Sequence, residues 1–172
     1  MCFRAHLQEF GKSWRNVDVR RDWWGTHCAR DRMLRGEAEY ALDEKGRVVI
    51  PPKFRVTLGE RVIVTRWIDP CLTAFSPVEW QSLEEKLRSQ PLKNRDFVRL
   101  LLSAAEDCDL DRQGRIYLPP HLRAYGGITR GVTIIGMGNR LEIWSTPLWR
   151  TRLRKVVKAP EALAKHLEEL IL

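Results

Sequence analysis

The 172-residue sequence has little of what catalytic, metal and disulfide sites require. Its four cysteines form no C-x-x-C pair and lie near no histidine at ligand spacing, which argues against a zinc site. We expect reduced thiols, with Cys71 and Cys108 packed as small apolar side chains. None of the four histidines stands beside a nucleophile or carboxylate motif. An enzyme, a metal or a cofactor is therefore not expected.

Long apolar runs are also absent. No stretch approaches the roughly 18 apolar residues of a membrane helix, and the N-terminus lacks the apolar segment of a secretion signal. We expect a cytoplasmic protein without membrane contact. Acidic residues are the minority, because 30 Lys and Arg against 22 Asp and Glu give a formal charge of +8. This balance favours a polyanionic partner, with nucleic acid ahead of an anionic membrane, although a merely basic soluble protein is the alternative.

What the sequence does contain is an internal repeat. Residues 42–55 read LDEKGRVVIPPKFR, and residues 110–123 read LDRQGRIYLPPHLR. The two copies align without a gap, are identical at seven of fourteen positions and keep apolar residues at three more. Such a repeat decides the fold, because each copy is one structural unit.

Each copy is expected to form a strand, a turn, a return strand and a helical turn. Residues 43–46 favour a tight turn, because Asp bonds its own backbone and Gly accepts a positive φ. The β-branched residues 48–50 predict the return strand of a hairpin. Pro51 then ends the strand, and Pro52 suits the first residue of a helix. The second copy predicts the same elements.

The remaining sequence predicts further strands and helices. Strands are expected at residues 37–42, 61–65, 71–75, 106–110, 132–135 and 141–144. A capping box at residues 76–79 predicts a helix start, and a second helix is expected over 95–105. Pro160 divides C-terminal helices, the last with Leu163, Leu167 and Leu170 in one row.

These elements predict an α+β protein made of two similar β-rich halves, each followed by helices. One half buries too little surface to be stable alone. We therefore expect the halves to interleave their strands into one closed barrel, which removes exposed sheet edges.

The expected segments are an N-terminal extension at 1–32, a first repeat at 33–81, connecting helices at 82–106, a second repeat at 107–150 and a helical end at 151–172. Two interpretations of the extension stay open. In the first, Met33 is the native start, and the extension is a misannotation or is disordered. In the second, the extension is a basic arm that lies along nucleic acid. The extension holds seven basic and four acidic residues, so the rest keeps a net charge of +5.

The repeated turn is the candidate binding site. Arg47 and Arg115 follow its glycines, and Asp43 and Asp111 stand four residues earlier. An aspartate at that distance can accept hydrogen bonds from the loop amides and from the guanidinium, which holds the arginine ready for a guanine or a phosphate. Nearby cations are expected to neutralise phosphates: Lys45, Lys53, Arg55, Arg112 and Arg123. The alternative is a tight turn with an Asp–Arg pair on a solvated surface.

These motifs resemble the MraZ family of bacterial transcriptional regulators, in the AbrB-like group of swapped-hairpin DNA-binding folds. The resemblance rests on MLRGEAEYALDEKGRVVIPPKFR, on two D-x-x-G-R turns followed by P-P-x-x-R, and on GNRLEIW at 138–144. It runs from Met33 to about Arg154. The D-x-x-x-R signature of the family maps onto Asp43 with Arg47 and onto Asp111 with Arg115.

The resemblance implies tandem AbrB-like repeats in a double-split β-barrel and a ring-shaped homo-oligomer. It also implies a nucleoid-associated regulator that binds short repeated double-stranded DNA sites upstream of the division and cell-wall gene cluster. The residues inside the turns differ, Glu44-Lys45 against Arg112-Gln113, so the two copies need not contact DNA in the same way. An antitoxin-like protein and a ring-forming scaffold without operator binding are the alternatives.

Overall fold

The fold is described from a computed structural model, which covers residues 33–161, 164 and 168–169, with the backbone alone at Leu92. Residues 33–172 form one unit, and residues 1–32 form another that contains no described residue. The expected N-terminal extension and the apolar row of the last helix therefore lie outside the described residues.

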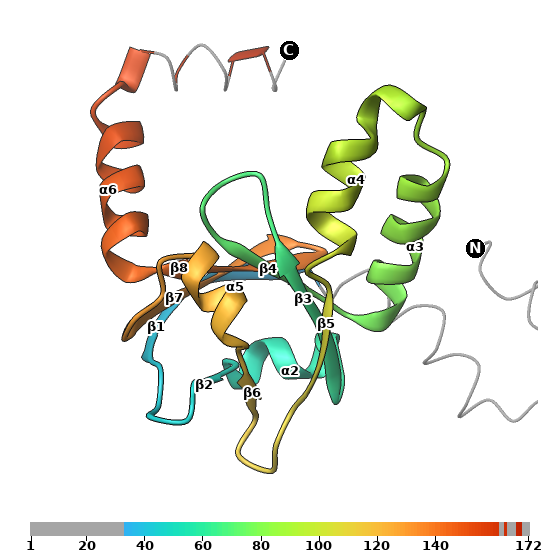
Figure 1. The fold of residues 1–172 in the computed structure, drawn as a ribbon. Coiled ribbons are helices and arrows are strands. Elements are labelled where there is room, and N and C mark those ends of the chain that lie inside the picture. Colours follow the sequence, from blue (N-terminus) through green and yellow to red (C-terminus); the bar gives the residue numbers. More distant parts are fainter. Residues whose placement is uncertain (1–32, 162–163, 165–167, 170–172) are drawn as a thin grey trace, which may run out of the picture. The chain divides into compact units, whose positions relative to one another are not determined.

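Strands from the two repeats are interleaved in one antiparallel sheet (Figure 1). Its strand order is β1 (Leu34–Ala41), β7 (Gly131–Gly138), β8 (Arg140–Ser145), β4 (Leu72–Phe75), β3 (Arg61–Arg66) and β5 (Glu106–Asp109). β1 of the first repeat pairs with β7 of the second over eight residue pairs, and β5 pairs with β3. The predicted interleaving of the two halves is confirmed.

A separate two-stranded ribbon joins the two copies of the repeat. β2 (Arg47–Val49) pairs antiparallel with β6 (Arg115–Tyr117), and Val48 lies opposite Ile116. The predicted turns form, but each return strand pairs with its counterpart in the other copy instead of completing a hairpin with the strand before it. An apolar strand pattern predicts a strand and does not specify its partner.

The closed barrel expected from the sequence does not form among the described residues. The sheet ends at β1 and β5, and the ribbon of β2 and β6 is a separate sheet. Pro51 and Pro119 follow the ribbon strands closely, and proline has no N–H to donate to a ladder. Each ribbon strand has three residues, and neither pairs with an edge strand of the sheet.

One hydrophobic core fills the space between the sheet and the ribbon. The short helices α2 (Pro52–Leu58) and α5 (Pro120–Tyr125) lie on the ribbon side of the sheet (Figure 1). Six of the apolar residues that match between the two copies are buried: Val48, Ile50, Phe54, Ile116, Leu118 and Leu122. The matching Leu42 and Leu110 are partly buried and pack against the same core. Their burial confirms that these residues belong to the fold.

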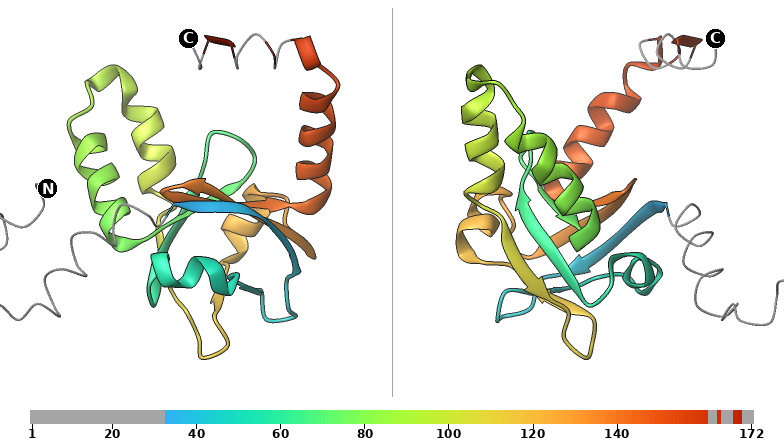
Figure 2. Two further views of the ribbon diagram at one scale, coloured as in Figure 1. Left: turned by 180° about the vertical axis from the view of Figure 1, so that it is seen from behind. Right: turned by 90° about the vertical axis from the view of Figure 1, so that its right-hand side faces the viewer.

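The longer helices stand on the opposite side of the sheet (Figure 2). α3 (Pro77–Arg88), the 3-10 turn η1 (Leu92–Asn94) and α4 (Arg95–Leu102) follow the first repeat, and α6 (Thr146–Val157) follows the second. The Ser76 hydroxyl accepts the Glu79 N–H at 3.3 Å, which confirms the predicted cap. The two repeats end with similar aromatic contacts, since the ring centres of Phe75 and Trp80 lie 5.9 Å apart and those of Trp144 and Trp149 lie 5.6 Å apart.

None of the helices in the described part of the chain is long and apolar enough to span a bilayer.

We predict that Gly136→Ala strongly destabilises the fold. A Cβ at this position would overlap the backbone of Leu34 and Arg35, because β1 crosses β7 closely there. The strands would have to separate, and we expect a loss of roughly 1–3 kcal/mol or more, as for overpacked cores. Urea denaturation measures it. Gly131→Ala on the same strand is the control, because its Cβ meets only the Thr146 side chain, at 3.1 Å. Equal losses would contradict a special close approach at Gly136.

Candidate functional site

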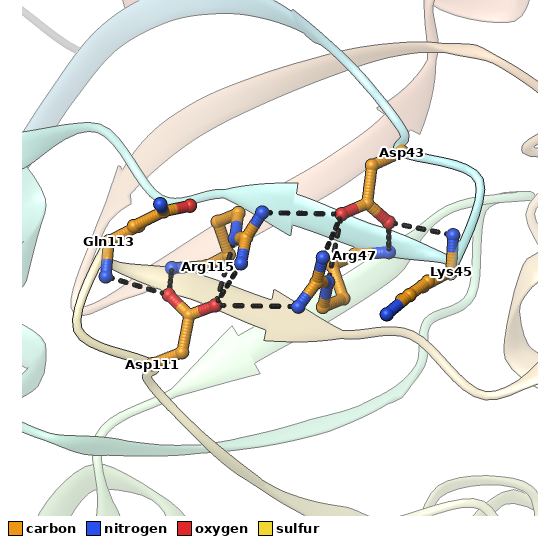
Figure 3. Close-up of polar contacts among 6 residues, drawn as sticks. All are labelled: Asp43, Lys45, Arg47, Asp111, Gln113 and Arg115. Atoms are coloured by element: carbon orange, nitrogen blue, oxygen red, sulfur yellow. Dashed lines mark hydrogen bonds and ion pairs between the residues drawn. The ribbon is translucent and has the colours of Figure 1, made fainter.

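Each repeated turn is closed by its aspartate (Figure 3). In the first turn, Asp43 Oδ1 accepts the backbone N–H of Lys45 at 3.0 Å and that of Arg47 at 2.8 Å. In the second, Asp111 Oδ1 accepts the N–H groups of Gln113 and Arg115, both at 2.9 Å. The loop-amide bonds predicted for these aspartates are therefore present.

The second carboxylate oxygen of each aspartate holds the arginine of the same turn. Asp43 Oδ2 lies 2.8 Å from both Nε and Nη2 of Arg47. Asp111 Oδ2 lies 2.8 Å from Nε and 2.7 Å from Nη2 of Arg115. One carboxylate thus holds both the loop backbone and the guanidinium, and this fixes the orientation of the arginine.

The ribbon brings the two Asp–Arg pairs together. Figure 3 shows the two guanidinium groups side by side over the ribbon, between the two carboxylates. Arg115 Nη1 lies 3.4 Å from Asp43 Oδ2, and Arg47 Nη1 lies 3.9 Å from Asp111 Oδ2. These cross-contacts are much longer than the bonds within each turn, and hydrogen bonds weaken at such distances. The four side chains are between 22% and 33% exposed.

The arginines keep both aspartates ionised. The side-chain and backbone hydrogen bonds from Arg115 lower the pKa of Asp111 to about 2. The pKa of Asp43 is also lowered, and the hydrogen bond from the backbone N–H of Arg47 is the largest cause. Two carboxylates and two guanidinium groups sum to no net charge at neutral pH. Any strong attraction for a polyanion must come from other side chains.

The other predicted cations have different positions. Lys45 and Arg112 are exposed at the tips of the two turns. Lys53 Nζ lies beside Gly36 and 4.8 Å from the centre of the Phe54 ring. Gly36 precedes the first turn by seven residues of an extended strand, roughly 20 Å. Lys53 is therefore not brought to the turn.

Arg55 and Arg123 each brace the turn of the other copy. Arg55 Nε donates to Ile50 O at 2.7 Å, and its guanidinium lies against Gly114. Arg123 Nε donates to Leu118 O at 3.0 Å, and its guanidinium lies against Gly46. Glycine is required in both turns for two reasons. Gly46 and Gly114 have φ values of 77° and 72°, and the absence of a Cβ leaves room for the arginine of the other copy.

Tyr117 is a candidate that the sequence analysis missed. It lies opposite Arg47 in the ribbon and is 48% exposed, while its neighbours Ile116 and Leu118 are buried. Strict alternation along the strand would have placed it on the outer face with the arginines. The first copy has Val49 at the matching position.

Within the described residues, no group of three or more His, Cys, Asp or Glu side chains is arranged to hold a metal ion. Burial is the largest cause of a raised pKa at both thiols. It raises the pKa of Cys108 to about 12 and that of Cys71 to a still higher value. Both thiols are buried and behave as apolar side chains, as predicted.

The geometry defines a class of protein: a tandem-repeat α/β protein whose copies exchange strands and join two acid-held arginines on one ribbon. A family model described as "MraZ protein, putative antitoxin-like" matches residues 33–100 and again residues 101–171. The chain belongs to the MraZ family.

Relatives named "Transcriptional regulator MraZ" are similar over most of the chain. The protein of Carboxydothermus hydrogenoformans is 43% identical over 143 residues, which cover 81% of this chain and 100% of that protein. That of Syntrophomonas wolfei subsp. wolfei is 45% identical over 141 residues, or 80% and 99%. That of Caldanaerobacter subterraneus subsp. tengcongensis is 42% identical over 139 residues, or 79% and 97%.

We predict that Gly114→Ala destabilises the protein more than Gly127→Ala does. Both glycines have positive φ values, 72° and 60°, so each alanine costs about 1–2 kcal/mol for the left-handed backbone. At Gly114 the Cβ would also overlap the Arg55 side chain, whereas at Gly127 it would meet the Leu148 side chain at an ordinary contact distance of 3.4 Å. Thermal unfolding measures both. Adding Arg55→Ala to Gly114→Ala should recover part of the loss, and no recovery would contradict the brace.

We predict that Asp111→Asn removes stability that depends on pH. The folded-state pKa of about 2 lies below the ordinary 3.8, so the ionised Asp111 stabilises the fold above about pH 4. That contribution is lost as the pH falls from about 4 to about 2. The variant should be less stable than the parent at pH 7, with a difference that shrinks over this interval. Urea denaturation at several pH values measures it.

Asp96→Asn is the matched control, because Asp96 is a 95% exposed carboxylate that pairs with Arg99 on α4. It should unfold like the parent at every pH. A difference between parent and Asp111→Asn that stays constant down to pH 2 would contradict a contribution from the ionised carboxylate.

Proposed function

We propose that this protein is a sequence-specific regulator of transcription that binds double-stranded DNA through the ribbon of β2 and β6. The observation that carries the proposal is the pair of acid-held arginines, Arg47 and Arg115, side by side on a separate ribbon. The major groove of B-DNA admits a two-stranded ribbon, and arginine is the commonest reader of guanine. The names of the relatives support a regulator.

The lengths of the contacts identify the atoms available to DNA. Nε and Nη2 of both arginines make bonds of 2.7–2.8 Å to the aspartates, whereas the Nη1 contacts span 3.4 and 3.9 Å. In this proposal the long contacts give way first. The N–H groups of Nη1 then turn to a guanine or a phosphate, while Asp43 and Asp111 keep each guanidinium in place.

In this proposal, phosphate contacts come from cations around the uncharged group formed by the two aspartates and the two arginines. Lys45 and Arg112 project from the turn tips and are placed to contact the two flanking backbones. Arg55 and Arg123 add charge beside the turns that they brace. Lys53 joins the interface only if the DNA extends along β1. Tyr117 supplies an exposed ring on the same outer face as Arg47.

We further propose that several copies form a ring homo-oligomer on short repeated sites upstream of the division and cell-wall gene cluster, in the cytoplasm with the nucleoid. One ribbon offers few base contacts and therefore little discrimination. Linked ribbons make later contacts intramolecular and raise avidity by ~10²–10⁴. Repeated DNA sites would match repeated subunits.

The domain organisation belongs to the same proposal. Residues 33–81 and 107–150 act as the two repeats, 82–106 connect them, 1–32 are an N-terminal extension and 151–172 form the helical end. In this proposal the sheet and the ribbon are the two parts of a double-split barrel that is not closed among the described residues.

An antitoxin-like role is the second candidate, because the matching family model carries that word in its description. Such a protein would bind a partner protein with or without DNA. A ring-forming scaffold without operator binding is a third candidate. Binding to the DNA directly upstream of the protein's own coding region separates both candidates from the regulator.

We predict that Arg47→Ala and Arg115→Ala each weaken specific DNA binding by about 5- to 150-fold, the 1–3 kcal/mol that a bidentate base contact provides. Arg47→Lys should also lose specificity, because lysine keeps the charge but lacks the planar fork. Fluorescence anisotropy on the upstream DNA and on a shuffled sequence measures binding across a salt series.

Arg99→Ala on the exposed face of α4 is the control and should bind like the parent. Light scattering and thermal unfolding must show that the assembly and fold of each variant are unchanged. Parental binding by both alanine variants across the salt series would refute this role for the turns. Dissociation of the assembly instead would make the Asp–Arg pairs structural.

A further inference from the structure

A basic pocket lies between the start of β7 and the start of α6. Its volume is about 550 Å³, and three arginines line it: Arg130, Arg150 and Arg154. Thr129 and Thr151 also line it, and none of the described residues that line it is acidic. The two aspartates and two arginines of the turns carry no net charge together. This pocket is therefore a separate concentration of positive charge.

The pocket belongs to the second repeat but lies beside the first turn. The backbone N–H of Leu42, the residue before Asp43, donates to Arg130 O at 2.7 Å. β7 starts at the next residue and pairs with β1 along its whole length. The exchange of strands therefore carries arginines of one copy to the flank of the other copy's turn.

Among the described residues, one carboxylate opposes the three arginines. Glu39 on β1 pairs with Arg150, whose Nη2 lies 2.9 Å from Oε2 and 3.1 Å from Oε1. Arg154 Nε donates to the carbonyl of Arg150 at 3.2 Å, which leaves its Nη groups to meet a ligand. The Arg130 side chain has no hydrogen bond or ion pair within the described part of the chain. A pocket lined by several guanidinium groups favours phosphate.

The matching place in the first repeat has the opposite charge. Leu110 N–H donates to Glu60 O at 2.8 Å, so Glu60 stands where Arg130 stands in the other copy. The matched rings of Trp80 and Trp149 place Gln81 and Glu85 where the pocket has Arg150 and Arg154. The fold therefore does not require these three arginines. Beside the second turn, Arg55 and Arg112 line a pocket together with Glu60, Asp109 and Asp111. The neighbouring Arg61 is paired with Asp109 at 2.7 Å.

We propose that this pocket is a phosphate-binding site that holds a DNA backbone phosphate beside the first turn. That the phosphate belongs to DNA rests on the proposed function. That the pocket binds phosphate is inferred from the residues of the pocket alone. The two turns then contact DNA unequally, because the first turn has an arginine anchor and the second has Glu60 in the matching place.

The test is the double variant Arg130→Ala/Arg154→Ala in the full chain. Arg150 is left unchanged because it pairs with Glu39. On both upstream and shuffled DNA, the slope of log K against log salt should fall in magnitude by about 0.9 for each phosphate that the variant no longer neutralises. Affinity should fall by a similar factor on both DNAs. This separates the pocket from the turns, whose variants lose discrimination between the two DNAs.

Lys93→Ala/Arg95→Ala is the matched control, because it also removes two exposed positive charges, near the start of α4. It should keep the parental salt slope. A second arm titrates inorganic phosphate into the parent and the pocket variant by calorimetry without DNA. Phosphate binding that the parent shows and the variant does not supports the pocket directly.

A reduced salt slope assigns the phosphate to DNA. An effect in the calorimetric arm alone supports a phosphate site and assigns it to a small phosphate ligand. A parental salt slope together with unchanged or absent phosphate binding would overturn the proposal. If the parent binds no DNA, the proposed function fails, and the calorimetric arm still tests the pocket.

Discussion

The pairing of β2 with β6 is the contact on which the rest of the structure depends. It buries Val48 and Ile116 completely and gives the short strands their only ladder within the described residues. It also sets the two turns side by side and lets Arg55 and Arg123 each reach the glycine of the other copy. Neither copy is complete alone, because each supplies the partner strand and the brace of the other. A change in one turn therefore acts on both.

Each of the two aspartates does two things. One oxygen closes its loop and the other holds an arginine, so one carboxylate fixes both the backbone and the arginine side chain. A fixed guanidinium loses less side-chain entropy when it meets a partner than a free one does. The two carboxylates and the two guanidinium groups also cancel in charge. Under the proposed function, the arginines of the turns would recognise DNA and the surrounding cations would attract it.

The sequence predicts what depends on neighbours along the chain: the Asp–Gly turns, the Ser76 cap and the hydrogen bonds that Asp43 accepts from Arg47. It does not predict what depends on distant partners. An apolar strand does not specify which strand it pairs with, so the sequence favours a local hairpin and a closed barrel that the structure does not contain among its described residues. For the same reason it presents Arg55 only as a phosphate contact, because nothing near it in sequence shows that it meets Gly114. Tyr117 is predictable from alternation, whereas closeness in sequence alone misplaces Lys53.

The exchange of strands also gives the difference between the copies a physical meaning. The ribbon is nearly symmetric, and a symmetric reader would bind DNA equally well in two opposite orientations. Residues of the second repeat flank the first turn, and those of the first repeat flank the second. Arg130 and Glu60 therefore place opposite charges at the two ends of the ribbon. If the ribbon binds DNA as proposed, such charges would separate the free energies of the two orientations, because one end would attract a phosphate and the other would repel it. Residues outside the repeated motif would then set the orientation of DNA on a site that the motif alone leaves symmetric.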